Sequence, residues 1–189
     1  MEAILTSITS VAIAEIGDKT QLLALFLATK YRNKTAIILG IFVATVLNHG
    51  ISAWLGNSIS QFMSEFWLSI LVGISFILLG LWLLIPDEDE QPSARFLKWG
   101  AFSATTFLFF LAEIGDKTQV ATVLLGAHFD DTLAVVIGST IGMMLANVPV
   151  VFAGQWLIAR INPTIMHKWA CALFILIGII TLCRPLLKG

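Results

Sequence analysis

The feature that most constrains this chain is a charged octapeptide that occurs twice within apolar sequence. The letters AEIGDKTQ begin at Ala14 and again at Ala112, 98 residues later, and long runs of aliphatic and aromatic residues surround both copies. An ionised side chain at the centre of a bilayer costs at least about 2.5 kcal/mol, so it is kept inside the protein and usually has a function. The repeat therefore predicts two related halves, each with a functional polar position at its centre.

The composition of the chain indicates a membrane protein. Hydrophobic residues make up 58% of the 189 positions and charged residues only 12%, with a mean hydropathy of +0.91. A soluble domain is about one quarter charged. The lipid bilayer is therefore the expected partner, and the formal net charge of −1 gives no reason to expect nucleic acid.

Six segments are long and apolar enough to cross a bilayer, which takes about 20 residues. Two of them, residues 4–29 and 99–127, contain the octapeptide. The other four have no Asp, Glu, Lys or Arg: residues 35–55, 66–85, 132–159 and 169–183, the last extending back to Asn162 and Pro163. None shows the alternating pattern of a membrane β-strand. We predict an all-α membrane protein with six transmembrane helices.

The two halves also match outside the octapeptide. At the same offset Gly40, Gly56 and Gly80 align with glycines at positions 138, 154 and 178. Three spans per half make the second half enter the membrane from the opposite side, as in many secondary transporters. The predicted organisation is therefore two inverted three-helix repeats, residues 1–85 and 99–189, joined by an acidic linker at 86–98.

Lysine and arginine in the expected loops predict the orientation, because cytoplasmic loops are enriched in both. Two of these residues lie on one side of the membrane, Arg184 and Lys188. Seven lie on the other side: Lys30, Arg32, Lys34, Arg95, Lys98, Arg160 and Lys168. We therefore expect the linker in the cytoplasm and both termini outside, which is the periplasm in a bacterium with two membranes.

The charges of the octapeptide suit a divalent cation. On a continuous helix Glu15 and Asp18 share a face, and Lys19 lies four residues from Glu15 and can pair with it. The two copies together carry a net charge of −2 when all six groups are ionised, and carboxylates are ligands that Ca²⁺, Mn²⁺ and Mg²⁺ accept. The candidate metal ligands are Glu15, Asp18, Glu113 and Asp116, with Lys19, Lys117, Gln21 and Gln119 on the same polar faces. The alternative is that each Glu–Lys pair only holds helices together.

Several other features leave two interpretations open. Gly17 and Gly115 either allow close helix approach or let the helix break at the site. Asn48, His49 and Asn147 either support the site or bond a neighbouring backbone carbonyl. His49 is also a candidate proton relay. Met143 and Met144 are either soft ligands that favour Mn²⁺ or packing residues.

The repeated EIGDKTQ resembles the signature Glu-x-Gly-Asp-(Lys/Arg)-(Thr/Ser) of a family of small cation/proton exchangers from bacteria, chloroplasts and the Golgi. The resemblance covers both motifs, the three-plus-three layout and the acidic linker, and implies bacterial manganese exporters as the most similar group. It implies that Glu15, Asp18, Glu113 and Asp116 form the ion site. It also implies that Thr20, Gln21, Thr118 and Gln119 are its polar surroundings.

The sequence and the resemblance together predict a secondary transporter, not an enzyme, that exports Mn²⁺ from the cytoplasm across a bacterial inner membrane. Protons are the expected counter-ion, and no cofactor is expected. The chain has no G-x-x-x-x-G-K-[ST] motif for ATP and no H-E-x-x-H motif for a metalloprotease. A Ca²⁺/H⁺ exchanger and a divalent cation channel remain as alternatives, and the sequence does not define an oligomeric state.

Overall fold

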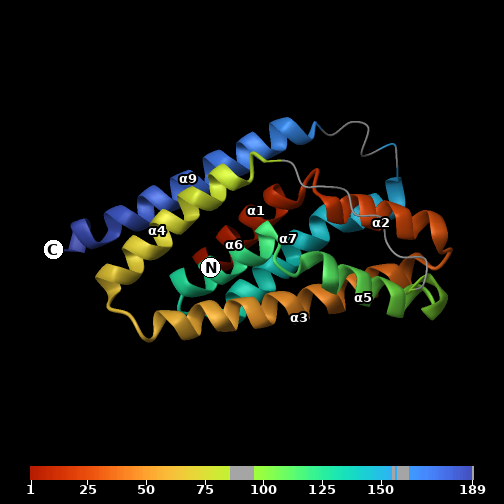
Figure 1. The fold of residues 1–189 in the computed structure, drawn as a ribbon, viewed down its shortest axis with the longest axis horizontal. Coiled ribbons are helices and arrows are strands. Elements are labelled where there is room, and N and C mark those ends of the chain that lie inside the picture. Colours follow the sequence, from red (N-terminus) through yellow and green to blue (C-terminus); the bar gives the residue numbers. More distant parts are fainter. Residues whose placement is uncertain (86–95, 155, 157–161, 189) are drawn as a thin grey trace.

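The computed structural model describes residues 1–85, 96–154, 156 and 162–188. Within these ranges the regular elements are all helices, and no strand occurs there (Figure 1). The predicted helical fold is therefore confirmed for this part of the chain. Most of the predicted acidic linker lies outside the described residues, as do Arg95 and Arg160, and its last three residues begin the 3₁₀ helix η1 (Phe96–Trp99).

Among the described residues, four helices are long and apolar enough to cross a membrane. They are α3 (Lys34–Ser60), α4 (Glu65–Trp82), α7 (Thr132–Ala153) and α9 (Pro163–Lys188). Each corresponds to one of the predicted segments without formal charge. The side chains of Asn33 and Asp131 cap the N-termini of α3 and α7 by accepting hydrogen bonds from the backbone. Helix α7 ends before the predicted residue 159, because Gly154 adopts φ +57°.

The two segments that contain the octapeptide are not continuous helices, as a single span would require. The first divides into α1 (Glu2–Glu15) and α2 (Lys19–Lys30), and the second into α5 (Ala101–Glu113) and α6 (Lys117–His128). The breaks occur at Gly17 and Gly115, with φ of +89° and +75°, a conformation that favours glycine. Both glycines therefore break the helix, and Gly17 also allows a close approach to Pro163 of α9.

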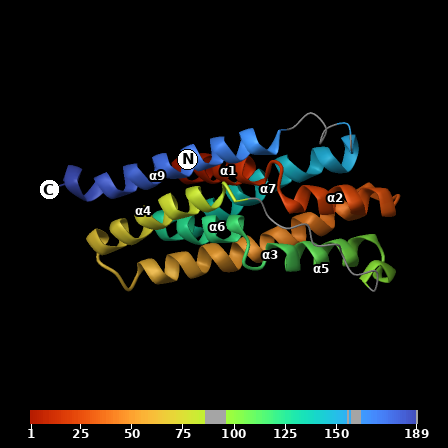
Figure 2. The same cartoon turned by 45° about the horizontal axis from the view of Figure 1, so that its top comes forward.

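Helices of the first half of the chain pack against helices of the second half (Figures 1 and 2). Helix α1 of the first half packs along α7 of the second, and α5 of the second half packs along α3 of the first. Helices α3 and α7 contact each other, and α4 packs along α9. The two halves therefore form one bundle in which each half covers the other.

Equivalent glycines make equivalent contacts in the two halves. A Cβ added at Gly40 of α3 would lie 2.7 Å from the Cβ of Thr105, and one added at Gly138 of α7 would lie 2.8 Å from the Cβ of Ser7. Both glycines and both partners are 98 positions apart. These glycines let the helices approach closely, so the same positions bring α3 onto α5 and α7 onto α1.

The contact between α4 and α9 follows the same rule. The ring centroids of Phe76 and Phe174, again 98 positions apart, lie 5.9 Å from each other at the centre of the contact. A Cβ added at Gly80 would lie 3.0 Å from the carbonyl oxygen of Cys171, and one added at Gly178 would lie 2.7 Å from that of Gly73. The repeat seen in the sequence is thus a repeat of three-dimensional contacts.

Candidate functional site

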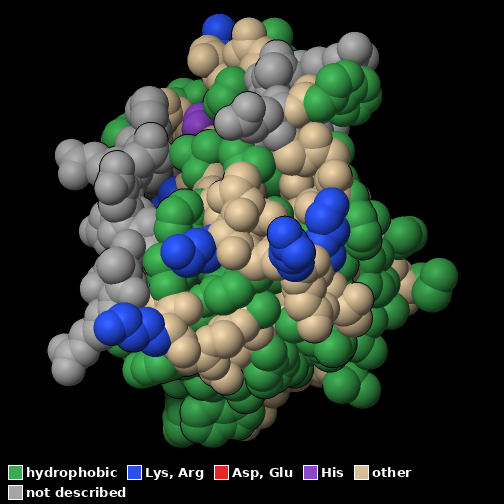
Figure 3. All heavy atoms as spheres, turned by 90° about the vertical axis from the view of Figure 1, so that its right-hand side faces the viewer, with side chains coloured by type: hydrophobic (Ala, Val, Ile, Leu, Met, Phe, Trp, Pro, Cys, Tyr) green, Lys and Arg blue, Asp and Glu red, His purple; other side chains and the backbone are tan. Residues whose placement is uncertain are grey.

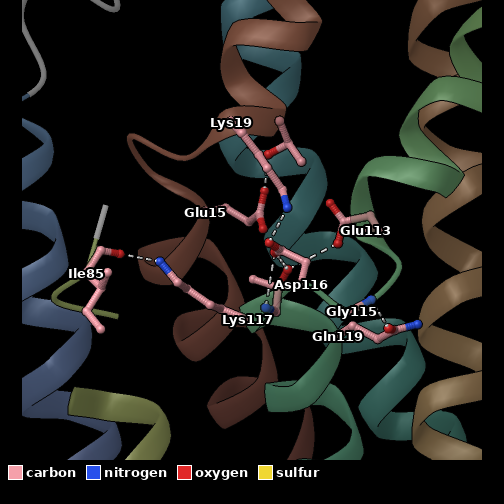
Figure 4. Close-up of polar contacts among 10 residues, drawn as sticks. Glu15, Lys19, Ile85, Glu113, Gly115, Asp116, Lys117 and Gln119 are labelled. Atoms are coloured by element: carbon pink, nitrogen blue, oxygen red, sulfur yellow. Dashed lines mark hydrogen bonds and ion pairs between the residues drawn. The ribbon is translucent and has the colours of Figure 1, made fainter. Parts of the chain in front are cut away.

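The two helix breaks bring carboxylates into the middle of the bundle (Figure 4). Glu15 is the last residue of α1 and Glu113 the last residue of α5, and both are fully buried. Asp116 precedes α6 and is 4% exposed. One carboxylate oxygen from each of these three residues lies within 4.8 Å of the other two. Both octapeptides therefore contribute to a single acidic cluster.

The two glutamates have the same local support. The Thr20 hydroxyl donates to Oε2 of Glu15, and the Thr118 hydroxyl donates to Oε2 of Glu113 at 3.1 Å. The other oxygen, Oε1, is buried in both glutamates and has no hydrogen-bond partner within the described residues. Each glutamate thus has one buried oxygen that a cation could satisfy.

Asp116 is the most strongly bonded carboxylate of the cluster. Its Oδ2 accepts a hydrogen bond from the hydroxyl of Thr118 at 2.9 Å, and its Oδ1 lies 2.7 Å from Nζ of Lys19. Helical spacing predicts a pair between Lys19 and Glu15, but the break at Gly17 ends that spacing. The ion pair instead joins the first octapeptide to the second.

The other two charged residues of the octapeptides lie differently. Lys117 is buried, and its Nζ donates to the backbone carbonyl of Ile85 just beyond α4 (Figure 4). Asp18 precedes α2 and is 7% exposed, but it is not one of the three carboxylates that meet. The carbonyl of Ile85 gave no sequence signal, because a backbone acceptor is present at every position.

The glutamines stabilise the breaks. Oε1 of Gln21 accepts a hydrogen bond from the backbone N–H of Gly17 at 2.9 Å, and Gln119 does the same for Gly115 at 2.7 Å. These N–H groups have left the helical ladder and need a partner. Nε2 of Gln21 also donates to the carbonyl of Ala146 on α7 at 2.9 Å. The octapeptide thus encodes the break as well as the charges.

The polar residues of α3 and α7 differ in their contacts with the acidic cluster. Nδ2 of Asn147 lies 3.4 Å from Oε2 of Glu15 and also donates to the carbonyl of Met143 at 3.2 Å, so both expected roles are combined in it. Sδ of Met143 lies 3.0 Å from the same Nδ2. Asn48 donates to the carbonyl of Phe110 at 3.1 Å, as the simpler interpretation expects. His49 is fully buried.

This arrangement of helices and carboxylates is typical of one class of protein. Three carboxylates this close in an apolar bundle repel one another unless metal ions or protons lie among them. Broken helices that meet inside a bundle are a common way to build an ion site in membrane transport proteins. The fold and the cluster together are those of a helical membrane protein that handles cations.

Comparison with known sequences gives the family. Residues 3–91 and 101–188 match the family described as divalent cation/proton antiporter GDT1. The chain belongs to this family of membrane antiporters. The two matched ranges correspond to the two halves and leave out part of the linker.

Individual relatives match nearly the whole chain. A protein of Vibrio cholerae named "Putative manganese exporter" is 45% identical over 185 residues, which cover 96% of this chain and 90% of the relative. GDT1-like protein 5 of Arabidopsis thaliana is 28% identical over 92% of each chain. The chloroplastic PAM71-homolog of the same plant is 27% identical over 89% of this chain and 56% of its own length. No solved structure matches the chain.

Proposed function

We propose that this protein exports Mn²⁺ from the cytoplasm in exchange for protons, through one acidic site that both octapeptides share. The proposed ligands are Glu15, Asp18, Glu113 and Asp116. The Vibrio cholerae relative named as a manganese exporter supports the choice of metal. Membership in a family of divalent cation/proton antiporters supports the exchange and argues against an enzymatic role.

The observation that carries this proposal is the meeting of Glu15, Glu113 and Asp116 in the buried interior. Oε1 of each glutamate has no hydrogen-bond donor in the part of the chain that the structure describes, so a bound cation would satisfy atoms that are otherwise costly to bury. Protons neutralise the same carboxylates when the metal leaves. Competition between metal and protons for one set of oxygens couples the two fluxes without a separate proton site.

The proposed membrane arrangement has six crossings, in which each broken pair of helices counts as one. The reciprocal glycine contacts support two halves of inverted orientation. Figure 3 looks onto the end of the bundle where Lys and Arg side chains gather, and Lys30, Arg32 and Lys98 are exposed. By the positive-inside rule this end is cytoplasmic, in a bacterial inner membrane with both termini outside.

The paired helices α4 and α9 are the proposed moving element. Helix α4 packs on α6 and helix α9 on α1. In the proposed orientation α1 and α6 are the outer parts of the two broken spans, whereas α2 and α5 are the inner parts. In the proposed movement, the α4–α9 pair shifts its contacts from the outer parts to the inner parts of the broken spans. Each half then makes the contacts that the other half made before. As a result, Asp18 takes the place of Asp116 in the cluster.

The orientation has a direct test in a variant whose Cys171 and Cys183 are replaced by serine. A single cysteine is placed at Arg32 or at Gln61, both exposed and at opposite ends of α3. A membrane-impermeant thiol reagent added to intact cells should label Gln61→Cys and spare Arg32→Cys. Labelling of Arg32→Cys alone would invert the proposed topology.

Flux in proteoliposomes tests the function. Purified protein is reconstituted with a Mn²⁺ indicator inside the vesicles, and a pH gradient is imposed in either direction. If the protein exchanges the two ions, Mn²⁺ should move toward the more acidic side of the membrane while protons move away from it. Addition of Mn²⁺ to one side should likewise drive protons in the direction opposite to that of Mn²⁺. Mn²⁺ flux without proton counter-movement would indicate a channel, and flux of Ca²⁺ but not Mn²⁺ would indicate a calcium exchanger. The three carboxylates provide the all-oxygen set that Ca²⁺ also prefers, so calcium is the second candidate.

A further inference from the structure

His49 is a buried ionisable residue that the proposed exchange does not use. It lies on α3 with 0% exposure, and neither ring nitrogen has a hydrogen-bond partner within the described residues. A buried imidazole normally has at least one partner, because an unsatisfied buried polar group costs about 1–3 kcal/mol. Its position in the bundle suggests what that partner is.

The sequence offset makes His49 the equivalent of Asn147. The two residues are 98 positions apart, the same separation as that of Glu15 from Glu113. In the second half's long helix, Asn147 places Nδ2 at 3.4 Å from Oε2 of Glu15. The equivalent contact in the other half would join His49 to Glu113.

The helix register supports the same pairing. Along α7 and α1, Gly138 faces Ser7, and Asn147 then faces Glu15 further along both helices. Along α3 and α5, Gly40 faces Thr105, and Asn48 bonds the carbonyl of Phe110 one turn before Glu113. His49 follows Gly40 by the same number of residues as Asn147 follows Gly138. His49 is therefore on the helix that borders Glu113, one residue after Asn48, although its ring is not among the groups whose ligand atoms meet in the acidic cluster.

We propose that His49 supplies a ring nitrogen to the ion held by Glu113, and that this nitrogen makes the site prefer Mn²⁺ to Ca²⁺ and Mg²⁺. Ca²⁺ and Mg²⁺ bind oxygen ligands, whereas first-row transition ions also accept imidazole nitrogen. Asn147 provides an amide at the equivalent place, and its Oδ1 is also buried, with no hydrogen-bond partner among the described residues. The two halves thus offer one oxygen and one nitrogen at positions that the repeat makes equivalent.

This inference rests on the proposed function, and one variant separates the two. His49→Asn puts the residue of the other half at this position, so the substitution keeps a polar side chain that the fold already accommodates at Asn147. His128→Asn is the matched control, because His128 lies at the end of α6 and its Nδ1 is 3.3 Å from the Thr181 hydroxyl, away from the cluster. Both variants are first checked for monodisperse elution in detergent.

Two measurements on the purified full chain test the proposal. Pulsed electron paramagnetic resonance of bound Mn²⁺ should show coupling to an imidazole ¹⁴N in the wild type and in His128→Asn, and none in His49→Asn. In competition binding, His49→Asn should reduce the preference for Mn²⁺ over Ca²⁺ at least about tenfold, the loss that even outer-shell partners cause.

The possible outcomes separate the two claims. Bound Mn²⁺ without nitrogen coupling in the wild type, or an unchanged Mn²⁺/Ca²⁺ preference in His49→Asn, would overturn the role of His49 and leave the proposed function intact. Failure of the wild type to bind or transport Mn²⁺ would overturn both.

Discussion

The two octapeptides have identical letters but different surroundings. Their shared features are local: the glycine that breaks the helix, the glutamine that caps the break and the threonine that bonds the glutamate. Their differences come from the rest of the bundle. Lys19 pairs with Asp116 across the halves, whereas Lys117 bonds the carbonyl of Ile85. An identical motif therefore fixes the construction of the site, and its surroundings assign different roles to equivalent residues.

The largest effect on Mn²⁺ efflux is expected from the glutamates, which have equivalent positions in the two octapeptides. Glu15→Gln and Glu113→Gln each keep the shape of the side chain but remove one negative charge from the cluster. Divalent cation affinity depends on ligand charge, so either change alone should reduce Mn²⁺ efflux at least about tenfold. Efflux from cells loaded with manganese, corrected for the amount of each variant in the membrane, measures this. Near-normal efflux in one of the two would show that the halves do not share a site.

Substitution of the two glycines at the breaks should lower the stability of the protein by different amounts. Alanine at either position is strained by about 1–2 kcal/mol because φ is positive. A Cβ at Gly17 would also lie 2.8 Å from the Cβ of Pro163, whereas a Cβ at Gly115 would have no atom of the described residues within 4 Å. Gly17→Ala should therefore lower the thermal unfolding temperature in detergent more than Gly115→Ala does. Equal shifts would mean that α9 moves away from Gly17 at no cost.

Substitution of the two threonines of the site should weaken Mn²⁺ binding by different amounts. The hydroxyl of Thr20 bonds one carboxylate of the cluster, whereas that of Thr118 bonds both Glu113 and Asp116. Valine keeps the shape of threonine without the hydroxyl. Thr118→Val should weaken Mn²⁺ binding by about tenfold, typical for groups that orient ligands, and Thr20→Val should weaken it less. Binding to the purified variants measures both effects, and a reversed order would contradict the observed hydrogen bonds.

The smallest expected difference concerns the lysines. Lys19 is 28% exposed and the Asp116 carboxylate 2% exposed, so solvent screens this pair only in part. Lys19→Met removes a positive charge beside Asp116, so the cluster should hold Mn²⁺ a few-fold more tightly and release it more slowly. Lys117→Met should instead lower stability, because it leaves the Ile85 carbonyl without its donor. The Mn²⁺ concentration for half-maximal transport, together with the unfolding temperature, distinguishes the two variants.

The contrast between the copies also shows what the sequence can predict. The four helices that correspond to charge-free segments follow from hydropathy, and the correspondence of Gly40 with Gly138 follows from a constant offset. The break at Gly17 was one of two options, because a glycine in an apolar run suits both a close helix contact and a positive φ. The structure shows that Gly40 makes the close contact and that Gly17 breaks the helix.

The site was harder to predict than the fold. The expected pair of Lys19 with Glu15 assumed helical spacing, and the break removed that assumption. The ion pair with Asp116 depends on how the halves meet, which one helix does not encode. The constant offset of 98 residues also aligns His49 with Asn147, a correspondence that the residues around either position do not reveal.

The central claim is that the two octapeptides form one ion site, and the stoichiometry of Mn²⁺ binding tests it most directly. Titration of the purified protein with Mn²⁺, followed by the loss of the free-ion paramagnetic resonance signal, should give one tightly bound ion per chain. Glu15→Gln and Asp116→Asn, which alter different octapeptides, should each abolish that binding. Two tightly bound ions per chain, or one that survives in either variant, would contradict a shared site.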